Sequence, residues 1–171
     1  MKDQNIVLVG FMGTGKTTIG RLLAKQMNWT FVDTDTTIEQ EQGTVISQLF
    51  ETLGEAQFRR IETDTLKRVL NARQQVIATG GGAVLAEENC RAMLQDGYVV
   101  ALIANSSTII QRVGGDQSRP LLKGDLHGRV TSLLELRKTA YDFADVKIDT
   151  TTQSIEQIIE SILTKRREAL D

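Results

Sequence analysis

The sequence is poor in cysteine, proline and histidine. Its 171 residues contain one residue of each kind. A single cysteine excludes an internal disulfide and a cysteine-based metal site, and Cys90 stands in a helix-like stretch where it is most simply a small buried residue. The lone His127 falls in a stretch that we expect to be a loop, without a visible partner, so we assign it no catalytic role.

The sequence also lacks a charge excess and a long hydrophobic run. Lys and Arg number 20, Asp and Glu number 22, and the net charge is -2, which gives no electrostatic footprint for nucleic acid. No apolar stretch approaches the ~20 residues of a membrane span, and no signal peptide precedes the first predicted strand. We therefore expect a cytoplasmic protein with one domain, residues 1–171, that binds neither nucleic acid nor membrane.

Short β-rich runs alternate with helical patterns, which is typical of a parallel sheet covered by helices on both faces. The expected strands are 6–9, 30–32, 76–78, 98–103 and 146–148. The expected helices are 16–27, 45–53, 55–70, 106–113, 130–144 and 154–165. Residues 114–128 hold four glycines and the only proline, which predicts a mobile loop.

The stretch GFMGTGKT at positions 10–17 matches G-x-x-x-x-G-K-[ST] at every required position. It follows a predicted strand and opens a predicted helix, so backbone N–H groups and the helix N-terminus can face phosphate oxygens. We expect a nucleoside triphosphate here, with Lys16 on its β- and γ-phosphates and the Thr17 hydroxyl on Mg²⁺. An ordinary glycine-rich turn would have no use for Lys-Thr at the helix start. The expected nucleotide-binding residues of this stretch are Gly13, Thr14, Gly15, Lys16, Thr17 and Thr18.

Two carboxylates, Asp33 and Asp35, stand two positions apart at the end of the second predicted strand. In an extended chain such residues face the same side. Beside a phosphate site, one carboxylate can serve the metal while the other takes a proton from a hydroxyl. The alternative is that one of them caps the following helix, which does not explain both.

Two further patterns follow. Arg59 and Glu62 are neighbours on one helix face, where a surface salt bridge is the alternative to a functional pair. Gly80, Gly81 and Gly82 come directly after the third predicted strand, at the edge where a parallel sheet binds its ligand. Three glycines favour backbone packed against a ligand over a simple turn.

The phosphate loop, the two aspartates, the Arg59–Glu62 pair and the triple glycine follow one another along the chain, and Arg119-Pro120-Leu121-Leu122 and Arg137 come after them. Over residues 6–149 this succession resembles that of shikimate kinases. The resemblance implies a three-layer α/β/α fold of the nucleoside monophosphate kinase type, whose five parallel strands run in the order 2-3-1-4-5. It implies a substrate-binding helical segment at about 34–62 and a lid at about 113–125. The implied reaction moves the γ-phosphoryl group of ATP, with Mg²⁺, to the 3-hydroxyl of shikimate, on the route to chorismate and the aromatic amino acids.

The resemblance also assigns roles by position. Asp35 becomes the partner of the shikimate hydroxyls and the catalytic base, and Asp33 joins Thr17 at the metal. Arg59 and Arg137 would grip the substrate carboxylate, which a planar guanidinium matches in a bidentate way and lysine does not. Glu62 would orient Arg59, and the backbone of residues 80–82 would line the same pocket.

Three residues are expected around the rest of the nucleotide. Arg119 resembles the lid arginine that reaches the phosphates and, with Lys16, stabilises the transferring group; a solvated loop arginine is the alternative. Arg112 resembles the arginine that stacks on adenine, or else is the last-turn cation of a helix. Gln153 belongs to the expected nucleotide set, in a stretch that lacks the proline which some family members place against adenine.

Other functions fit less well. A gluconate-type or nucleoside monophosphate kinase would share the phosphate loop and lid but not the Asp-x-Asp pattern, the Phe58-Arg59 pair or the triple glycine. A non-catalytic nucleotide switch that reads guanine would carry Asn-Lys-x-Asp, and the nearest stretch, residues 164–167, lacks the Asp. We therefore expect a monomeric small-molecule kinase whose partners are shikimate and ATP.

Overall fold

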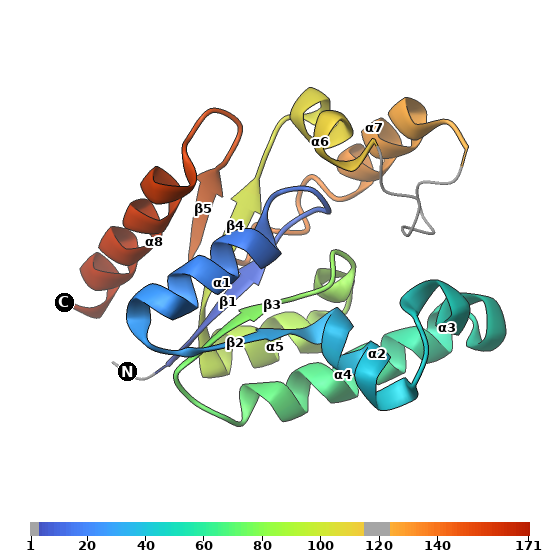
Figure 1. The fold of residues 1–171 in the computed structure, drawn as a ribbon, viewed down its shortest axis with the longest axis horizontal. Helices are drawn as coiled ribbons and strands as arrows, with labels where there is room; N and C mark the ends of the chain where they lie inside the picture. Colours follow the sequence, from blue (N-terminus) through green and yellow to red (C-terminus); the bar gives the residue numbers. More distant parts are fainter. Residues whose placement is uncertain (1–3, 115–123) are drawn as a thin grey trace.

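The computed structural model describes residues 4–114 and 124–171. Within them the sheet has five strands, all parallel, in the order β2-β3-β1-β4-β5 (Figure 1). The strands are β1 (Asn5–Val9), β2 (Thr30–Asp33), β3 (Gln75–Ala78), β4 (Gly97–Ile103) and β5 (Val146–Asp149). The predicted fold class and strand order are confirmed.

Helices cover both faces of this sheet (Figure 1). They are α1 (Lys16–Met27), α2 (Thr34–Gln42), α3 (Ile46–Leu53), α4 (Glu55–Leu70), α5 (Glu87–Asp96), α6 (Ser106–Val113), α7 (Leu126–Leu136) and α8 (Ile155–Leu170), with a short 3₁₀ turn, η1 (Ala83–Leu85). Helices α1 and α8 pack on one face, and α4 and α5 pack on the other. None of the helices in the described ranges has the length and apolar character that crossing a bilayer requires.

The central strand β1 shows why the core has two halves. Ile6 and Leu8 belong to the cluster under α1 and α8, whereas Val7 and Val9 belong to the cluster under α4 and α5. Successive side chains of a strand point to opposite faces, and both faces of a parallel sheet are buried, so β1 is apolar at consecutive positions. The loop after β1 is therefore fixed to the most buried part of the molecule.

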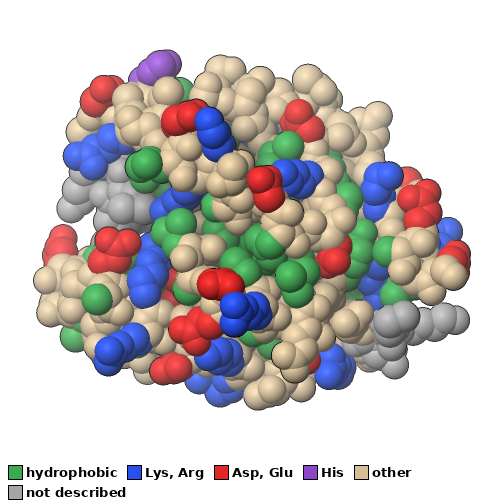
Figure 2. All heavy atoms as spheres, turned by 180° about the vertical axis from the view of Figure 1, so that it is seen from behind, with side chains coloured by type: hydrophobic (Ala, Val, Ile, Leu, Met, Phe, Trp, Pro, Cys, Tyr) green, Lys and Arg blue, Asp and Glu red, His purple; other side chains and the backbone are tan. Residues whose placement is uncertain are grey.

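The rear face of the molecule shows hydrophobic side chains at its middle among charged ones (Figure 2). Large hydrophobic residues that stay exposed in the chain include Leu85, at 53%, and Leu94, at 41%. Apolar atoms make up about 55–60% of the accessible surface of an ordinary folded protein. This face alone therefore indicates no binding site.

Helix α5 contains the helix-like stretch around Cys90, and two further stretches differ from the predicted elements. Within the predicted helical segment 34–62, the structure adds α2, which begins at its N-cap Asp33 and ends at Gly43, whose φ is 68°. Helix α7 begins at Leu126 because Asp125 caps it by accepting a hydrogen bond from Gly128 N at 3.2 Å. His127 thus lies in a helix and not in a loop.

The same helix ends earlier than predicted. Arg137 leaves the helical conformation, at φ -106° and ψ 10°, and tight turns replace the predicted helix up to residue 144. Their hydrogen bonds span three residues, as from Ala140 N to Arg137 O at 3.0 Å. Tyr141 is 6% exposed and packs in the core, so tertiary packing overrides the local helical pattern. This irregular stretch is what places Arg137 at the site.

Candidate active site

The phosphate loop, residues 10–15, connects β1 to α1. Its glycines at positions 10, 13 and 15 have φ values of 152°, 75° and 95°, which residues with a side chain rarely adopt. A Cβ at Gly10 would lie 2.4 Å from the Leu102 carbonyl oxygen, and one at Gly13 would lie 2.7 Å from Cγ1 of Val113. Gly15 is the N-cap of α1 and supplies no side-chain cap, so the first N–H groups of α1 remain available to an anion.

Lys16 folds back over this loop. Its Nζ donates hydrogen bonds to Gly10 O at 2.7 Å and to Phe11 O at 3.0 Å. The buried Thr14 hydroxyl donates to the same Phe11 O at 2.7 Å, which fixes the shape of the loop. Hydrogen bonds between two charged groups are stronger than those to neutral carbonyls, so a phosphate can draw the Lys16 ammonium away from these oxygens.

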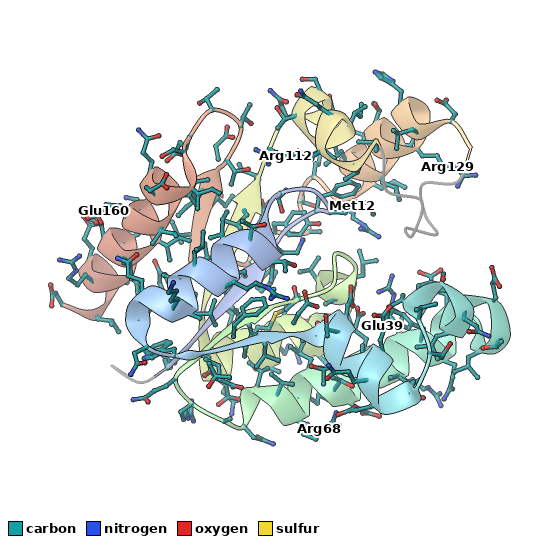
Figure 3. The ribbon with its side chains drawn as sticks, in the orientation of Figure 1. Met12, Glu39, Arg68, Arg112, Arg129 and Glu160 are labelled. Carbon is teal, nitrogen blue, oxygen red and sulfur yellow. The ribbon has the colours of Figure 1, made fainter. Side chains whose placement is uncertain are left out.

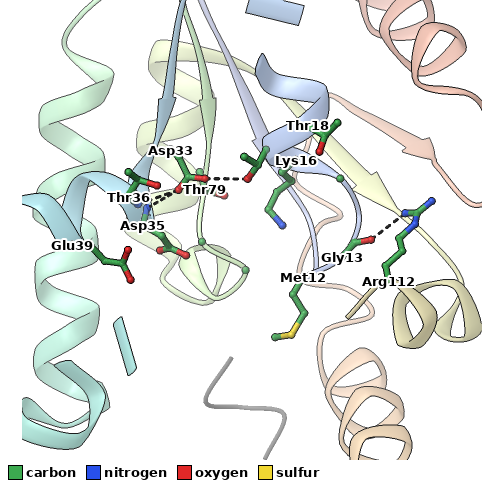
Figure 4. A pocket seen from close by; sticks show the side chains of 14 residues that line it. Met12, Gly13, Lys16, Thr18, Asp33, Asp35, Thr36, Glu39, Thr79 and Arg112 are labelled. Carbon is green, nitrogen blue, oxygen red and sulfur yellow. Dashed lines mark hydrogen bonds between the residues drawn. The ribbon is translucent and has the colours of Figure 1, made fainter. Parts of the chain in front are cut away.

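A cavity of about 410 Å³ lies between the phosphate loop, the start of α2 and the residues after β3 (Figure 4). The predicted residues that line it are Gly13, Gly15, Lys16, Thr17, Thr18, Asp33, Asp35, Gly80, Gly81 and Arg112. The structure thus brings the phosphate loop, the carboxylate pair and the triple glycine to one place.

Asp33 uses both of its carboxylate oxygens. Oδ1 accepts hydrogen bonds from Asp35 N at 3.0 Å and Thr36 N at 3.2 Å, as an N-cap does. Oδ2 accepts from the Thr17 hydroxyl at 3.1 Å. The capping alternative is therefore correct, and the same side chain also faces the predicted metal partner Thr17.

Asp35 does not extend the strand, as the two-residue spacing predicted, but lies in the first turn of α2. It still faces the cavity because the cap at Asp33 turns the chain there. Burial raises the pKa of Asp35 to about 6, with further increases from Asp33, Glu62 and Glu39 and an opposing effect of Lys16. This carboxylate is ionised above that pH and can accept a proton.

A second cavity of about 510 Å³ adjoins the first and shares Asp35, Met12 and Glu39 with it. Figure 3 shows Met12 on the phosphate loop and Glu39 on α2, on the two sides of this region. The predicted residues that line the second cavity are Asp35, Arg59, Glu62, Gly80, Gly81, Gly82 and Arg137. Asp35 therefore stands where the two cavities meet.

Arg59 and Glu62 form a pair inside this cavity and not on the surface. Arg59 Nη1 lies 2.8 Å from Glu62 Oε1, and the Glu62 side chain is 1% exposed. The Arg59 guanidinium also lies over the rings of Phe50 and Phe58, at 5.8 Å and 5.4 Å. Burial raises the pKa of Glu62, whereas the nearby Arg59 and Arg137 lower it. The pair holds the Arg59 guanidinium in one orientation.

Arg137 is the second cation of this cavity and is 5% exposed. Its guanidinium lies 5.7 Å from the Phe11 ring centre, and Nη1 makes a long contact of 3.5 Å with Gly81 O. No ion pair links it to a carboxylate within 4.0 Å in the part of the chain that the structure describes. The Tyr141 hydroxyl also lies beside this guanidinium, which without a carboxylate partner is ready to bind an anion.

The triple glycine makes room for side chains. A Cβ at Gly80 would lie 2.7 Å from Asp35 Oδ1, and one at Gly82 would lie 2.4 Å from Arg59 Nη2. Neither glycine has a positive φ, so space and not backbone angle requires them. Side chains around the cavity thus approach this backbone closely, and its packing against a ligand stays a prediction.

The remaining predicted nucleotide residues fall in different places. The Arg112 guanidinium donates to Gly13 O at 3.0 Å and to the Thr150 hydroxyl at 3.1 Å, which sets it beside the phosphate loop. Gln153 donates to Asp149 O at 2.6 Å, and it lines neither of the two cavities found among the described residues. Arg119 lies outside the described residues, as does most of the predicted lid.

Glu39, Met12 and Phe50 line one or both cavities and were not among the predicted site residues. Glu39 follows Asp35 by four positions and therefore shares its face of α2, which was a usable signal once that helix was recognised. Met12 and Phe50 carry apolar side chains, which sequence alone does not distinguish from core residues.

The chain is similar in sequence to shikimate kinases, and it shares its fold, at 14% identity and a TM-score of 0.59, with a gluconokinase from Sinorhizobium meliloti, of which it covers 93% with 98% of its own length. The shikimate kinase family model matches residues 12–167. The shikimate kinase of Moorella thermoacetica is 48% identical over 146 residues, which are 85% of this chain and 84% of that protein. That of Pelotomaculum thermopropionicum is 42% identical over 161 residues, 94% of each chain. The structure of shikimate kinase from Acinetobacter baumannii in complex with shikimate has a TM-score of 0.93 at 36% identity and covers 97% of this chain and 94% of its own.

The raised pKa of Asp35 predicts a pH-dependent stability. The folded chain binds a proton on Asp35 more tightly than the unfolded chain does, so the contribution of Asp35 to the free energy of unfolding falls as pH rises from about 4 through 6. Asp35→Asn removes the buried charge and should stabilise the free protein at pH 7.5 by on the order of 1–3 kcal/mol, but not at pH 4. Thermal unfolding in EDTA at both pH values measures this, with the exposed Asp64→Asn as control. A variant no more stable than the parent at pH 7.5 would contradict it.

Proposed function

This chain belongs to the shikimate kinase family of ATP-dependent phosphotransferases, and from this premise we propose that it transfers the γ-phosphoryl group of ATP to the 3-hydroxyl of shikimate. The products are shikimate 3-phosphate and ADP. The structural observation that supports the proposal is the position of Asp35, which lies where the cavity beside the phosphate loop meets a cavity that holds two arginines. A base between a phosphate donor and an anion-binding pocket is what phosphorylation of a hydroxy acid requires.

The acceptor is oriented through its carboxylate. Arg137 and Arg59 bind the carboxylate, Arg137 with few competing acceptors and Arg59 with its guanidinium fixed by Glu62. Phe50 and Phe58 face the apolar part of the acceptor from the same cavity. Holding the carboxylate at one end leaves the hydroxyls at the other end, toward Asp35.

Asp35 accepts the proton of the attacking hydroxyl. Its pKa of about 6 leaves it ionised at neutral pH yet more basic than an ordinary aspartate, whose value is 3.8. General-base assistance of this kind contributes about 10²–10⁴ in rate. The rest of the acceleration comes from positioning and charge stabilisation, because phosphoryl transfer needs little covalent help from the protein.

The nucleotide phosphates occupy the loop of residues 10–15, and Lys16 moves from its carbonyl partners onto the β- and γ-phosphates. Mg²⁺ fits Thr17 and Asp33, whose side-chain oxygens lie 3.1 Å apart at the cavity. The described residues hold no group of three or more His, Cys, Asp or Glu that could bind a metal alone, and Mg²⁺ is ordinarily held by one or two protein groups together with phosphates and water. When bound, the ion neutralises phosphate charge.

Several further assignments belong to the same proposal. Arg112 flanks the adenine of ATP, and Arg119 closes over the phosphates from the lid at about 113–125. Residues 1–171 act as one monomeric kinase domain in which about 34–62 bind the acceptor. Gel filtration of the purified protein tests the monomer.

The proposal is tested by ADP release from the purified protein with Mg-ATP. Shikimate, gluconate, AMP and no acceptor are compared side by side. Release that needs shikimate supports the assignment. Release with gluconate or AMP alone, or ATP binding without acceptor-dependent release, would overturn it in favour of another kinase or a nucleotide switch.

Asp35→Asn should lower kcat by about 10²–10⁴, because the amide keeps the shape of the side chain but does not accept the proton. ATP binding, measured by calorimetry, should stay within twofold. Asp64→Asn, at an exposed position of α4, serves as the control and should retain kcat. A near-normal kcat in Asp35→Asn would remove Asp35 from the mechanism.

Arg59→Lys and Arg137→Lys should each raise KM for shikimate roughly tenfold or more, since lysine keeps the charge but loses the bidentate hydrogen bonds. KM for ATP should change less than twofold, because both arginines lie in the acceptor cavity. Arg60→Lys is the matched control, as Arg60 is the exposed neighbour of Arg59 on α4. Equal effects on both KM values would count against carboxylate binding by these residues.

A further inference from the structure

Glu39 lines both cavities and, apart from its contribution to the raised pKa of Asp35, has no part in the proposed chemistry. It lies one turn after Asp35 on α2, and Figure 4 shows both side chains on the same wall of the pocket. Its Oε1 accepts a hydrogen bond from Ile46 N at 2.9 Å. Glu39 thus joins α2 to the first residue of α3.

Helix α3 needs this bond because it has no cap of its own. Its N-cap residue is Val45, whose side chain makes no capping hydrogen bond. The first N–H groups of a helix lack partners within the helix, and valine is a poor residue at that position. A carboxylate from the neighbouring helix satisfies one of these groups and is favoured by the positive end of the helix dipole.

The start of α3 is also a wall of the acceptor cavity. Val45, Ile46, Ser47 and Phe50 all line it. Val45 is 54% exposed and adds little packing at the start of α3. Leu49, at 3% exposed, and the half-buried Ile46 and Phe50 pack on the small cluster of Ile38 and Phe58, and the Glu39 bond adds a polar anchor at the Ile46 amide.

We propose that Glu39 is a positioning residue that fixes the α3 wall of the acceptor cavity relative to Asp35. The inference rests on the proposed function. Asp33 caps the start of α2 and so places Asp35, and Glu39 on the next turn of the same helix places the wall. One rigid helix therefore sets the distance between the group that takes the proton and the surface against which the acceptor packs.

The phosphate side does not depend on this bond. The loop of residues 10–15 is shaped by its own glycines and by the Thr14 hydroxyl. Loss of the Glu39 bond should therefore weaken acceptor binding and leave ATP binding intact. A general loss of folding would weaken both.

The experiment compares Glu39→Ala, Glu39→Gln and the control Gln48→Ala. Gln48 is exposed on α3 and accepts a hydrogen bond from the Thr44 hydroxyl at 2.5 Å, so its truncation removes a different side-chain hydrogen bond near this helix start. Glu39→Ala should raise KM for shikimate about tenfold, change KM for ATP less than twofold, and speed hydrogen exchange of the Ile46 amide about tenfold or more. Glu39→Gln keeps the acceptor oxygen and should recover KM and Ile46 protection to within about threefold. Gln48→Ala should change neither quantity.

Two results would overturn the inference. Unchanged KM for shikimate and unchanged exchange of the Ile46 amide in Glu39→Ala would show that the Glu39 bond does not fix the start of α3. Equally raised KM in Glu39→Ala and Glu39→Gln, with the Ile46 amide still protected, would show that the charge acts on the acceptor directly. If the parent protein does not phosphorylate shikimate, the proposed function fails by itself, and Ile46 exchange in the same variants still decides whether Glu39 fixes α3.

Discussion

The Asp33 carboxylate is the contact on which the geometry of the site depends. One oxygen caps α2 and the other accepts from Thr17 at the start of α1, so a single side chain joins the end of β2 to two helices. Because the cap sets where α2 begins, it also sets where Asp35 faces. The phosphate side and the acceptor side of the site are therefore positioned by the same group. Because Asp33 is the last residue of β2, the position of both sides is fixed to the sheet.

The site concentrates charge in little space, and this accounts for its chemistry. Burial raises the pKa of Asp35, the nearby carboxylates Asp33 and Glu62 raise it further, and Glu62 also holds Arg59. The glycines at 80 and 82 allow this density, since a Cβ at either would collide with the charged side chains. An anionic acceptor at the arginines and a nucleotide at Lys16 would supply counter-ions to the cations of the site.

Local sequence patterns predicted most elements because their causes are local. The phosphate loop, the alternation of strands and helices, and α4 at Glu55–Leu70 follow from spacing and turn residues. Helix α2 was missed, although Asp33 and Gly43 mark its two ends. The early end of α7 had no such signal, because it results from Tyr141 packing in the core and Arg137 turning toward Gly81.

The sequence by itself determined the parallel α/β fold and the phosphate loop, because both follow from short-range spacing, and the family resemblance supplied the predicted set of site residues. Only the tertiary structure decided how the set is arranged. It buried the Arg59–Glu62 pair that sequence also allowed on the surface, brought Arg137 beside the triple glycine, and gave Glu39 its bond to α3. These relations join distant parts of the chain, and their energies depend on burial and distance, which exist only after folding.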